Sequence, residues 1–422
     1  MTAGPPPLMG PIESANLVME RCDILARYSE EPDRITRRFA TPPMRHVNDE
    51  VATWMKNAGM KVWQDKIGNL IGRYEADQPD TSTLLLGSHL DTVRDAGRYD
   101  GPLGVMIALA CVERLHSQQQ RLPFAIEVLA FADEEGLRYR TAYLGSKVVA
   151  GTLDLNLLQW TDNDSIPLED AIRAFGGDPN NLWASKRRPD DLLGYCEVHI
   201  EQGPILEALD LPVGVVTAIS GQNRIAVSFT GQAGHAGTVP MNMRHDALCA
   251  AAEFVLAAET LGRNQPGLVV TIGQISAQPG ASNVIPGLVL LSLDVRHQDD
   301  AIRAQALQQL QEQAHSIATF RQLSVVWDVI QGHSTVYCSP SLVRHLSQAV
   351  AAAGYTVHEL PSGAGHDGVS LSELTKIAML FVRCKGGISH NPAESVTTAD
   401  VATAIQVMEQ FLTQLAQEQR PL

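Results

Sequence analysis

The sequence lacks several features that mark other classes of protein. No apolar run approaches the roughly 18 residues that a membrane-spanning helix requires, and residues 1–11 show no basic start followed by an apolar stretch. The six cysteines are scattered without a Cys-x-x-Cys pair, mostly in apolar segments, which is typical of buried free thiols. We therefore expect no membrane partner and a location in the reducing cytoplasm.

Positive charge is also scarce. The chain carries 32 Lys and Arg residues against 47 Asp and Glu residues, a formal net charge of −15. This balance argues against nucleic acid or an anionic membrane as a partner. The sequence shows no long run of one charge, no internal repeat and no low-complexity tract, and its hydrophobic content of 45% is that of an ordinary globular protein.

The length and the pattern of apolar residues predict two domains. At 422 residues the chain exceeds the roughly 250–300 residues at which one core stops growing. Helical spacing precedes a short hairpin that ends near residue 74, and strands then alternate with helices. We expect helices at 14–28, 44–58 and 103–116, strands at 83–86, 125–131 and 194–199, and short helices and loops over 151–193. This alternation predicts an α/β domain with a largely parallel sheet.

A second pattern interrupts the first. We expect strands at 224–230, 268–275, 289–296 and 324–330 and helices at 245–261 and 300–320, which is the ferredoxin-like order βαββαβ. The first pattern then resumes with a helix at 341–353, a strand at 356–359, an apolar run at 377–384 and a helix at 398–416. The predicted large domain therefore covers 1–220 and 333–422, and the inserted domain covers 221–332.

Residue types that bind metals lie close to the ends of the expected strands or just before a helix. They are His89, Asp100, Glu135, His199 and His390. In open α/β sheets, ligand sites form at the carboxyl ends of the strands. His89 and Asp91 point to the same side of an extended backbone, so Asp91 is placed to orient a metal-bound His89. Because such groups are costly to desolvate unpaired, the pattern indicates two divalent cations and hydrolytic chemistry.

Each of these residues also has a simpler explanation when it is taken alone. Asp100 precedes Gly-Pro and suits a turn or a helix cap, while Glu134 and Glu135 suit a solvated acidic loop. A strand-end histidine such as His199 is commonly packed or hydrogen-bonded. However, a carboxylate such as Asp100 has two oxygens with which to bridge two ions. The metal site is favoured because all five residues occur together.

With their surrounding motifs, these residues resemble the dinuclear-metal amidohydrolases and exopeptidases of peptidase family M20 over essentially the whole chain. The resemblance implies a zinc-exopeptidase-like α/β/α catalytic domain interrupted by a ferredoxin-like lid and dimerisation domain. It implies that one ion is held by His89, Asp100 and His199, and the other by Asp100, Glu135 and His390, with Glu134 as general base and Asp91 orienting a histidine. Mn²⁺ or Zn²⁺ is expected, and Co²⁺ or Ni²⁺ suits the same ligands.

Other residues resemble the substrate-binding residues of the family. Gly234-His235-Ala236-Gly237 is similar to the lid motif whose histidine polarises the scissile carbonyl in the opposite subunit, which implies a homodimer. His235, Asn283 and Arg296 are expected to act across that interface. The implied substrate contacts are Gln202, Arg224, Asn283, Arg296, Gly363 and His366. Without the resemblance, the His235 segment suits a turn and the arginines suit a sheet surface, although guanidinium groups also bind carboxylates in bidentate fashion.

His199 determines the expected substrate. Exopeptidases of the family usually have a carboxylate there, whereas the segment from His199 to Gly203 resembles the branch that acts on ureido and carbamoyl compounds. The segment from Gly221 to Arg224 looks most like allantoate-processing members. We expect hydrolysis of the terminal ureido group of allantoate, a step of purine catabolism, to ureidoglycine, ammonia and carbon dioxide. N-carbamoyl-L-amino acids and then ureidoglycolate are the next candidates, followed by an aminopeptidase or dipeptidase or a non-catalytic metal-binding protein.

Overall fold

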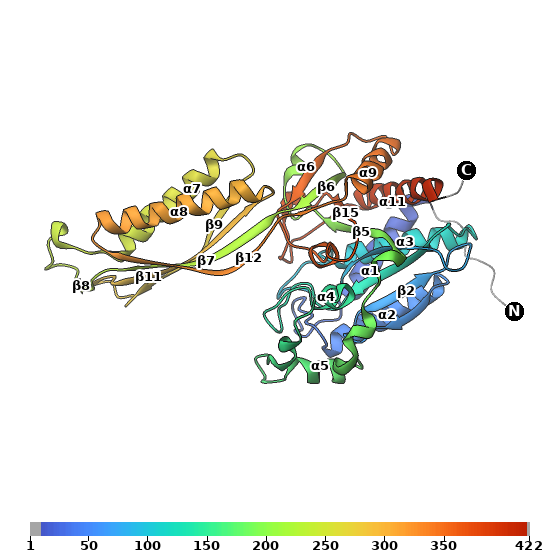
Figure 1. The fold of residues 1–422 in the computed structure, drawn as a ribbon, viewed down its shortest axis with the longest axis horizontal. Coiled ribbons are helices and arrows are strands. Elements are labelled where there is room, and N and C mark those ends of the chain that lie inside the picture. The colour runs from blue at the N-terminus through green and yellow to red at the C-terminus, as the bar shows by residue number, and fades with distance from the viewer. Residues whose placement is uncertain (1–9, 420–422) are drawn as a thin grey trace. The chain divides into compact units, whose positions relative to one another are not determined.

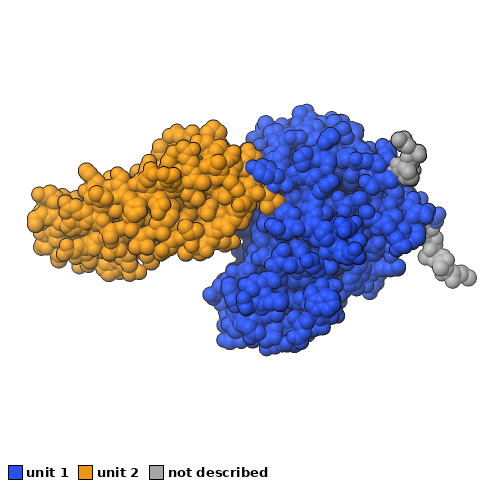
Figure 2. Space-filling view, in the orientation of Figure 1, with its two compact units in different colours: residues 1–217, 337–422 blue, residues 218–336 orange. Residues whose placement is uncertain are grey.

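The computed structural model describes residues 10–419, which divide into two compact units (Figures 1 and 2). Unit 1 contains the chain up to residue 217 and from 337 onward, and unit 2 contains residues 218–336. The sequence places the inserted domain at 221–332. The expectation for residues 1–11 falls almost wholly outside the described residues. Among residues 10–419, no helix combines the length and the apolar character that crossing a membrane requires.

Unit 1 is built on a nine-stranded mixed sheet. Eight strands follow the spatial order β1-β2-β4-β3-β5-β15-β6-β13, and β14 pairs with β6. Their bounds are β1 Lys61–Gln64, β2 Leu70–Tyr74, β3 Thr83–His89, β4 Ala125–Phe131, β5 Leu192–Ile200, β6 Val213–Ile219, β13 Val336–Tyr337, β14 Glu359–Ser362 and β15 Ile377–Val382. This mixed α/β architecture confirms the expected fold class.

The centre of this sheet is parallel. Strands β4, β3, β5 and β15 are neighbours that run in one direction. β3, β4 and β15 are buried at every residue, as is typical of parallel strands covered on both faces. The carboxyl ends of the four strands therefore open at the same edge of the sheet, and this edge is where the candidate ligands lie.

The helices of unit 1 pack around this sheet (Figure 1). They are α1 Pro11–Leu25, α2 Pro42–Asn57, α3 Pro102–Ser117, α4 Leu144–Ala150, α5 Leu168–Ala174, α6 Ile205–Ala208, α9 Pro340–Ala352, α10 Gly368–Leu371 and α11 Thr398–Gln419. α1, α3 and α11 pack against one another, and α3 also contacts β3 and β5. α3 begins with Pro102, whose fixed φ suits the first turn of a helix.

Unit 2 is an antiparallel four-stranded sheet, in the order β12-β7-β11-β9, that packs against two helices (Figure 1). Its elements are β7 Gly221–Thr230, α7 Ala247–Asn264, β9 Val269–Gln278, β11 Leu288–His297, α8 Asp300–Phe320 and β12 Ser324–His333. A two-stranded ladder of β8 (Gly234–His235) and β10 (Val284–Ile285) is added to them. The main elements follow the order βαββαβ that the sequence predicts.

Two parts of unit 1 differ from the sequence-based expectation. The strand expected at 356–359 is wrong, because β14 spans Glu359–Ser362 and residues 355–358 are mostly exposed after α9 ends. The sequence analysis also assigns no strand to β6, whose Val-Gly-Val-Val run pairs antiparallel with β15. Both differences arise where β6 and its partners extend the sheet beyond its parallel centre.

Gly104 in α3 gives a test of the packing between α3 and the sheet. A Cβ atom there would lie 2.0 Å from the carbonyl oxygen of Val198 in β5. Because a backbone atom cannot move aside cheaply, we expect Gly104→Ala to lower the free energy of unfolding by about 1–3 kcal/mol. Denaturant unfolding measures this. Gly262→Ala in α7 is the control: its Cβ meets nothing closer than 3.5 Å, and it should add about 0.5–1 kcal/mol of helix stability. Equal changes in the free energy of unfolding in the two variants would refute the close packing of α3 against β5 at Gly104.

Candidate metal centre and active site

Five side chains from four neighbouring strands and their loops converge at the carboxyl edge of the unit 1 sheet. His89 ends β3, Glu135 follows β4, His199 lies near the end of β5, and His390 lies in the loop after β15. Asp100 lies in the loop that leads into α3. Three His and carboxylate groups of the kind that hold metal ions are formed from these residues and Glu134: His89, Asp100 and His199; Asp100, Glu135 and His390; and His89, Glu134 and Glu135.

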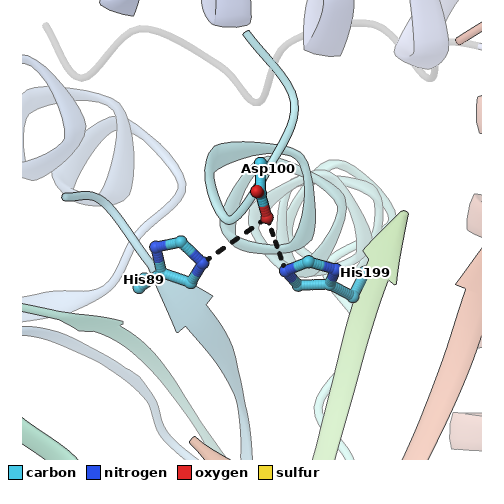
Figure 3. Close-up of side chains that lie close together, drawn as sticks. All are labelled: His89, Asp100 and His199. Carbon is cyan, nitrogen blue, oxygen red and sulfur yellow. Dashed lines mark ion pairs between the residues drawn. The ribbon is translucent and has the colours of Figure 1, made fainter. Parts of the chain in front are cut away.

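Asp100 is the centre of this arrangement. Its Oδ1 lies 3.1 Å from Nε2 of His199 and 3.8 Å from Nε2 of His89 (Figure 3). Its Oδ2 lies 3.0 Å from Nε2 of His390, which is itself 3.5 Å from Oε1 of Glu135. The two carboxylate oxygens therefore face two different groups of ligand-type atoms, as a bridging ligand requires.

Backbone carbonyls fix the orientation of two of the imidazoles. Nδ1 of His89 lies 3.0 Å from the carbonyl oxygen of Asp91, and Nδ1 of His199 lies 2.9 Å from that of Ile200. Because a carbonyl only accepts hydrogen bonds, Nδ1 of each ring donates to it, and Nε2 of each ring is the atom that faces Asp100. The Asp91 carboxylate is farther from His89, at 3.4 Å.

The carboxylate of Asp91 has a second set of partners. Its Oδ1 accepts a hydrogen bond from the backbone nitrogen of Glu134 at 3.0 Å, and its Oδ2 accepts one from that of Glu135 at 3.1 Å. Asp91 is 1% exposed. It therefore holds the turn that carries both glutamates, in addition to facing His89.

Burial and neighbouring charges shift the pKa values of these groups in opposite directions. Burial opposes ionisation of Asp100, but hydrogen bonds from His199 and His390 hold its pKa well below the usual range. The hydrogen bond to Asp100 raises the pKa of His390 to about 9. Burial, then the charge of Glu135, raises the pKa of Glu134 well above its usual range. Burial, then the charge of Asp100, raises the pKa of Glu135 to about 7. The carboxyl edge of the sheet thus combines Asp100, whose environment favours the ionised carboxylate, with Glu134, whose environment favours the protonated form.

Gln202 joins this cluster directly. Its φ of 57° is unusual for a non-glycine residue, and its Nε2 donates to Oδ2 of Asp100 and to Oγ of Ser389, each at 3.1 Å. A carboxylate only accepts hydrogen bonds, so the amide nitrogen must face Asp100. Its Oε1 is buried and has no hydrogen-bond partner among residues 10–419.

His366 lies beside the cluster and Gly363 lies in the segment before it. His366 is 1% exposed, its ring centroid is 4.5 Å from that of His199, and its Nε2 lies 2.8 Å from Oγ of Ser362. Burial, then the neighbouring His199, holds the pKa of His366 well below its usual range, so this ring is neutral. A Cβ added at Gly363 would meet no atom within 4 Å, so the space beside this glycine is open.

In unit 2, the two expected arginines share one carboxylate. Asp294 of β11 pairs in register with Arg224 of β7. Its Oδ1 lies 2.8 Å from Nε of Arg296, and its Oδ2 lies 3.3 Å from Nε of Arg224. Nε2 of Gln222 also donates to this carboxylate. The sequence analysis does not identify Asp294, although its position two residues before Arg296 puts both on one face of the strand.

The other two expected residues of unit 2 also lie together. His235 pairs with Val284 across the β8–β10 ladder, and the carbonyl of Asn283 accepts a hydrogen bond from the backbone nitrogen of Ala236 at 3.0 Å. Both side chains are exposed. Nδ1 of His235 accepts a hydrogen bond from the backbone nitrogen of Gly237 at 3.0 Å, so the proton of this ring is on Nε2.

The residues present suit two divalent cations. The donor set is three imidazoles and two carboxylates, and Nε2 of the two most buried imidazoles, His89 and His199, faces the same carboxylate oxygen. Mixed nitrogen and oxygen ligands of this kind suit Zn²⁺ and Mn²⁺ and leave the choice among first-row metals open.

Comparison with known proteins gives one consistent result. Residues 85–414 match the profile of peptidase family M20/M25/M40. Allantoate deiminase 1 of Glycine max is 38% identical over 423 residues, covering 93% of this chain and 88% of that protein. An N-carbamoyl-L-amino acid amidohydrolase of Geobacillus stearothermophilus is 39% identical over 383 residues, covering 91% and 94%. The crystal structure of a hydantoinase/carbamoylase family amidase from Burkholderia multivorans superposes with a TM-score of 0.89 at 31% identity, covering 97% of this chain and 98% of that one.

The arrangement around Asp100 predicts a specific metal stoichiometry. After chelation and reloading with Mn²⁺ or Zn²⁺, we expect two ions per wild-type chain and one in His390→Ala, since His89, Asp100 and His199 remain. Inductively coupled plasma mass spectrometry after gel filtration measures this. His315→Ala, an exposed change on α8, is the control and should retain both ions. Two ions in His390→Ala would contradict the ligand assignment.

Proposed function

The chain belongs to peptidase family M20/M25/M40, and from this premise we propose that it hydrolyses the terminal ureido group of allantoate, giving ureidoglycine, ammonia and carbon dioxide. Its relatives at 38–39% identity are hydrolases of non-peptide C–N bonds. The observation that carries the proposal is the position of Asp100, with each oxygen facing a different group of ligand-type atoms beside Glu134.

The proposed centre takes two cations. His89, Asp100 and His199 would hold one, and Asp100, Glu135 and His390 would hold the other. Bound divalent cations polarise a substrate carbonyl and lower the pKa of water. Mn²⁺ or Zn²⁺ is our preferred metal, and Co²⁺ or Ni²⁺ fits the same donors.

Glu134 acts as the general base in this proposal. It takes a proton from the attacking water and returns it to the departing nitrogen. Two observations support the role: its pKa is raised by burial, then by the charge of Glu135, and Asp91 holds the backbone of both glutamates. Asp91 thereby keeps the base and the ligand Glu135 in fixed relation.

Gln202 is proposed to bind the ureido group. Its buried Oε1 needs a donor, and the terminal –NH₂ of a ureido group supplies one. His366 and Gly363 would line the same side of the substrate. His366 is neutral and supports the ring of His199, while the open space at Gly363 leaves room for substrate atoms.

The residues of unit 2 are proposed to bind the rest of the substrate in a homodimer. Arg224 and Arg296 suit a carboxylate, since guanidinium groups bind carboxylates in bidentate fashion. His235 and Asn283, which lie together at the β8–β10 ladder, would polarise and hold the ureido carbonyl of the partner subunit's substrate. This assignment follows the resemblance of the His235 motif to the lid motif of the family.

N-carbamoyl-L-amino acid hydrolysis is the second candidate function. The relative from Geobacillus stearothermophilus is as similar as the allantoate deiminases are. Both substrate classes carry a carboxylate and a ureido group, so the metal centre and the arginines serve either one. The shape of the pocket around the rest of the substrate decides between them.

A substrate panel tests the proposal. Protein reloaded with Mn²⁺ or Zn²⁺ should release ammonia from allantoate with a kcat/KM above that for N-carbamoyl-L-amino acids, and it should leave dipeptides intact. Glu134→Gln is the matched inactive control: we expect a loss of about 10²–10⁴-fold in kcat with unchanged metal content. Preference for an N-carbamoyl amino acid would transfer the assignment to the second candidate, and cleavage of dipeptides alone would overturn both.

Subunit mixing tests the proposed role of His235. Neither His235→Ala nor Glu134→Gln homodimers should be active. When equal amounts are unfolded and refolded together, activity should return to about a quarter of wild type, because half of the dimers are mixed and each keeps one intact site. Ammonia release measures the recovered activity, and analytical ultracentrifugation measures whether the refolded chains are dimers. Mixed dimers without activity would show that His235 does not act across the interface.

A further inference from the structure

A buried glutamate outside the expected ligand set contacts the loop that carries Asp100. Oε1 of Glu394 accepts hydrogen bonds from the backbone nitrogens of Tyr99 at 2.8 Å and Asp100 at 3.1 Å. Glu394 is 5% exposed. One oxygen of the Glu394 carboxylate therefore holds two successive backbone nitrogens, the second of which belongs to Asp100.

The same carboxylate also reaches the loop that carries His390. Oγ of Ser389 lies 3.3 Å from Oε2 of Glu394 and 3.1 Å from Oδ2 of Asp100. Because a serine hydroxyl has one proton and Nε2 of Gln202 donates to it, this proton is shared between the two carboxylates. Glu394 thus links two loops that are almost 300 residues apart in the sequence.

The surrounding backbone leaves this glutamate little freedom. A Cβ at Gly97 would lie 2.3 Å from Cδ of Glu394. On the other side of Asp100, Gly101 has a φ of 86° and lies so close to His89 that a Cβ there would be 2.5 Å from the imidazole ring. Gly101 thus permits a positive φ and a close approach to His89, while Glu394 accepts hydrogen bonds from the two backbone nitrogens that precede it.

We propose that Glu394 is a positioning residue that holds the backbone of Asp100, and through Ser389 the loop of His390, so that the two oxygens of the Asp100 carboxylate face the two groups of residues that would hold the cations. This role rests on the proposed metal-dependent function. Its effect is on the affinity for both cations, because each cation position includes an oxygen of Asp100. Groups that orient metal ligands typically contribute about 10–100-fold to metal affinity.

The test is metal affinity, measured by competition with a chromophoric chelator for Mn²⁺ and Zn²⁺. We expect Glu394→Ala to weaken binding of both ions by about 10–100-fold. Glu394→Gln should stay within about threefold, since its amide oxygen still accepts from Tyr99 and Asp100 and its –NH₂ donates to Ser389. Gly97→Ala pushes the Glu394 carboxylate aside without removing it, so it should weaken metal binding as Glu394→Ala does. It replaces Glu394→Ala in the test if Glu394→Ala fails to fold.

Asp162→Ala is the matched control. Asp162 is 8% exposed, and it accepts hydrogen bonds from the backbone nitrogens of Asp164 and Ile166, each at 2.9 Å, and from the side chain of Arg138. The Asp162→Ala change should lower the melting temperature of the protein and leave its metal affinity at the wild-type value. Wild-type affinity in Glu394→Ala, or equal losses in Asp162→Ala, would overturn the positioning role alone. A wild-type protein that binds neither Mn²⁺ nor Zn²⁺ would overturn the proposed metal centre as well.

Discussion

The ionised carboxylate of Asp100 is the constraint on which the site depends. It is 5% exposed, and burying a lone charge to this extent is costly unless hydrogen-bonding partners surround it. Imidazoles on both oxygens, Gln202 and Ser389 supply those partners. Because these groups come from separate strands and loops, the charge of one side chain requires the whole carboxyl edge of the sheet to be assembled in one geometry.

The sequence predicts the parts of this arrangement that repeat along the chain. Buried strands such as β3 and β4 appear as continuous apolar runs, and the residue type that follows each run is visible directly. Since parallel strands open at one edge, the sequence alone is enough to group His89, Glu135, His199 and His390. The expected family, the α/β class and the hydrolase class are confirmed.

The contacts between these residues cannot be predicted in the same way. The sequence leads us to expect that Asp91 orients His89, but its carboxylate also holds the backbone of Glu134 and Glu135. Glu394 binds loop nitrogens that are almost 300 positions away in the sequence, and no periodicity reports such a contact. Residue type and strand position therefore identify ligand candidates, whereas the groups that orient them depend on loop geometry that only the folded chain defines.

The shared carboxylate of Asp294 has a consequence for selectivity. An anion that approaches Arg224 or Arg296 meets guanidinium groups already engaged by a carboxylate tethered on the same sheet. A tethered competitor acts at a high effective concentration, so a small anion with only charge to offer displaces it poorly. A ligand that makes further contacts at the same time has the advantage. If these arginines bind the substrate carboxylate as proposed, Asp294 would make them discriminate by shape as well as by charge.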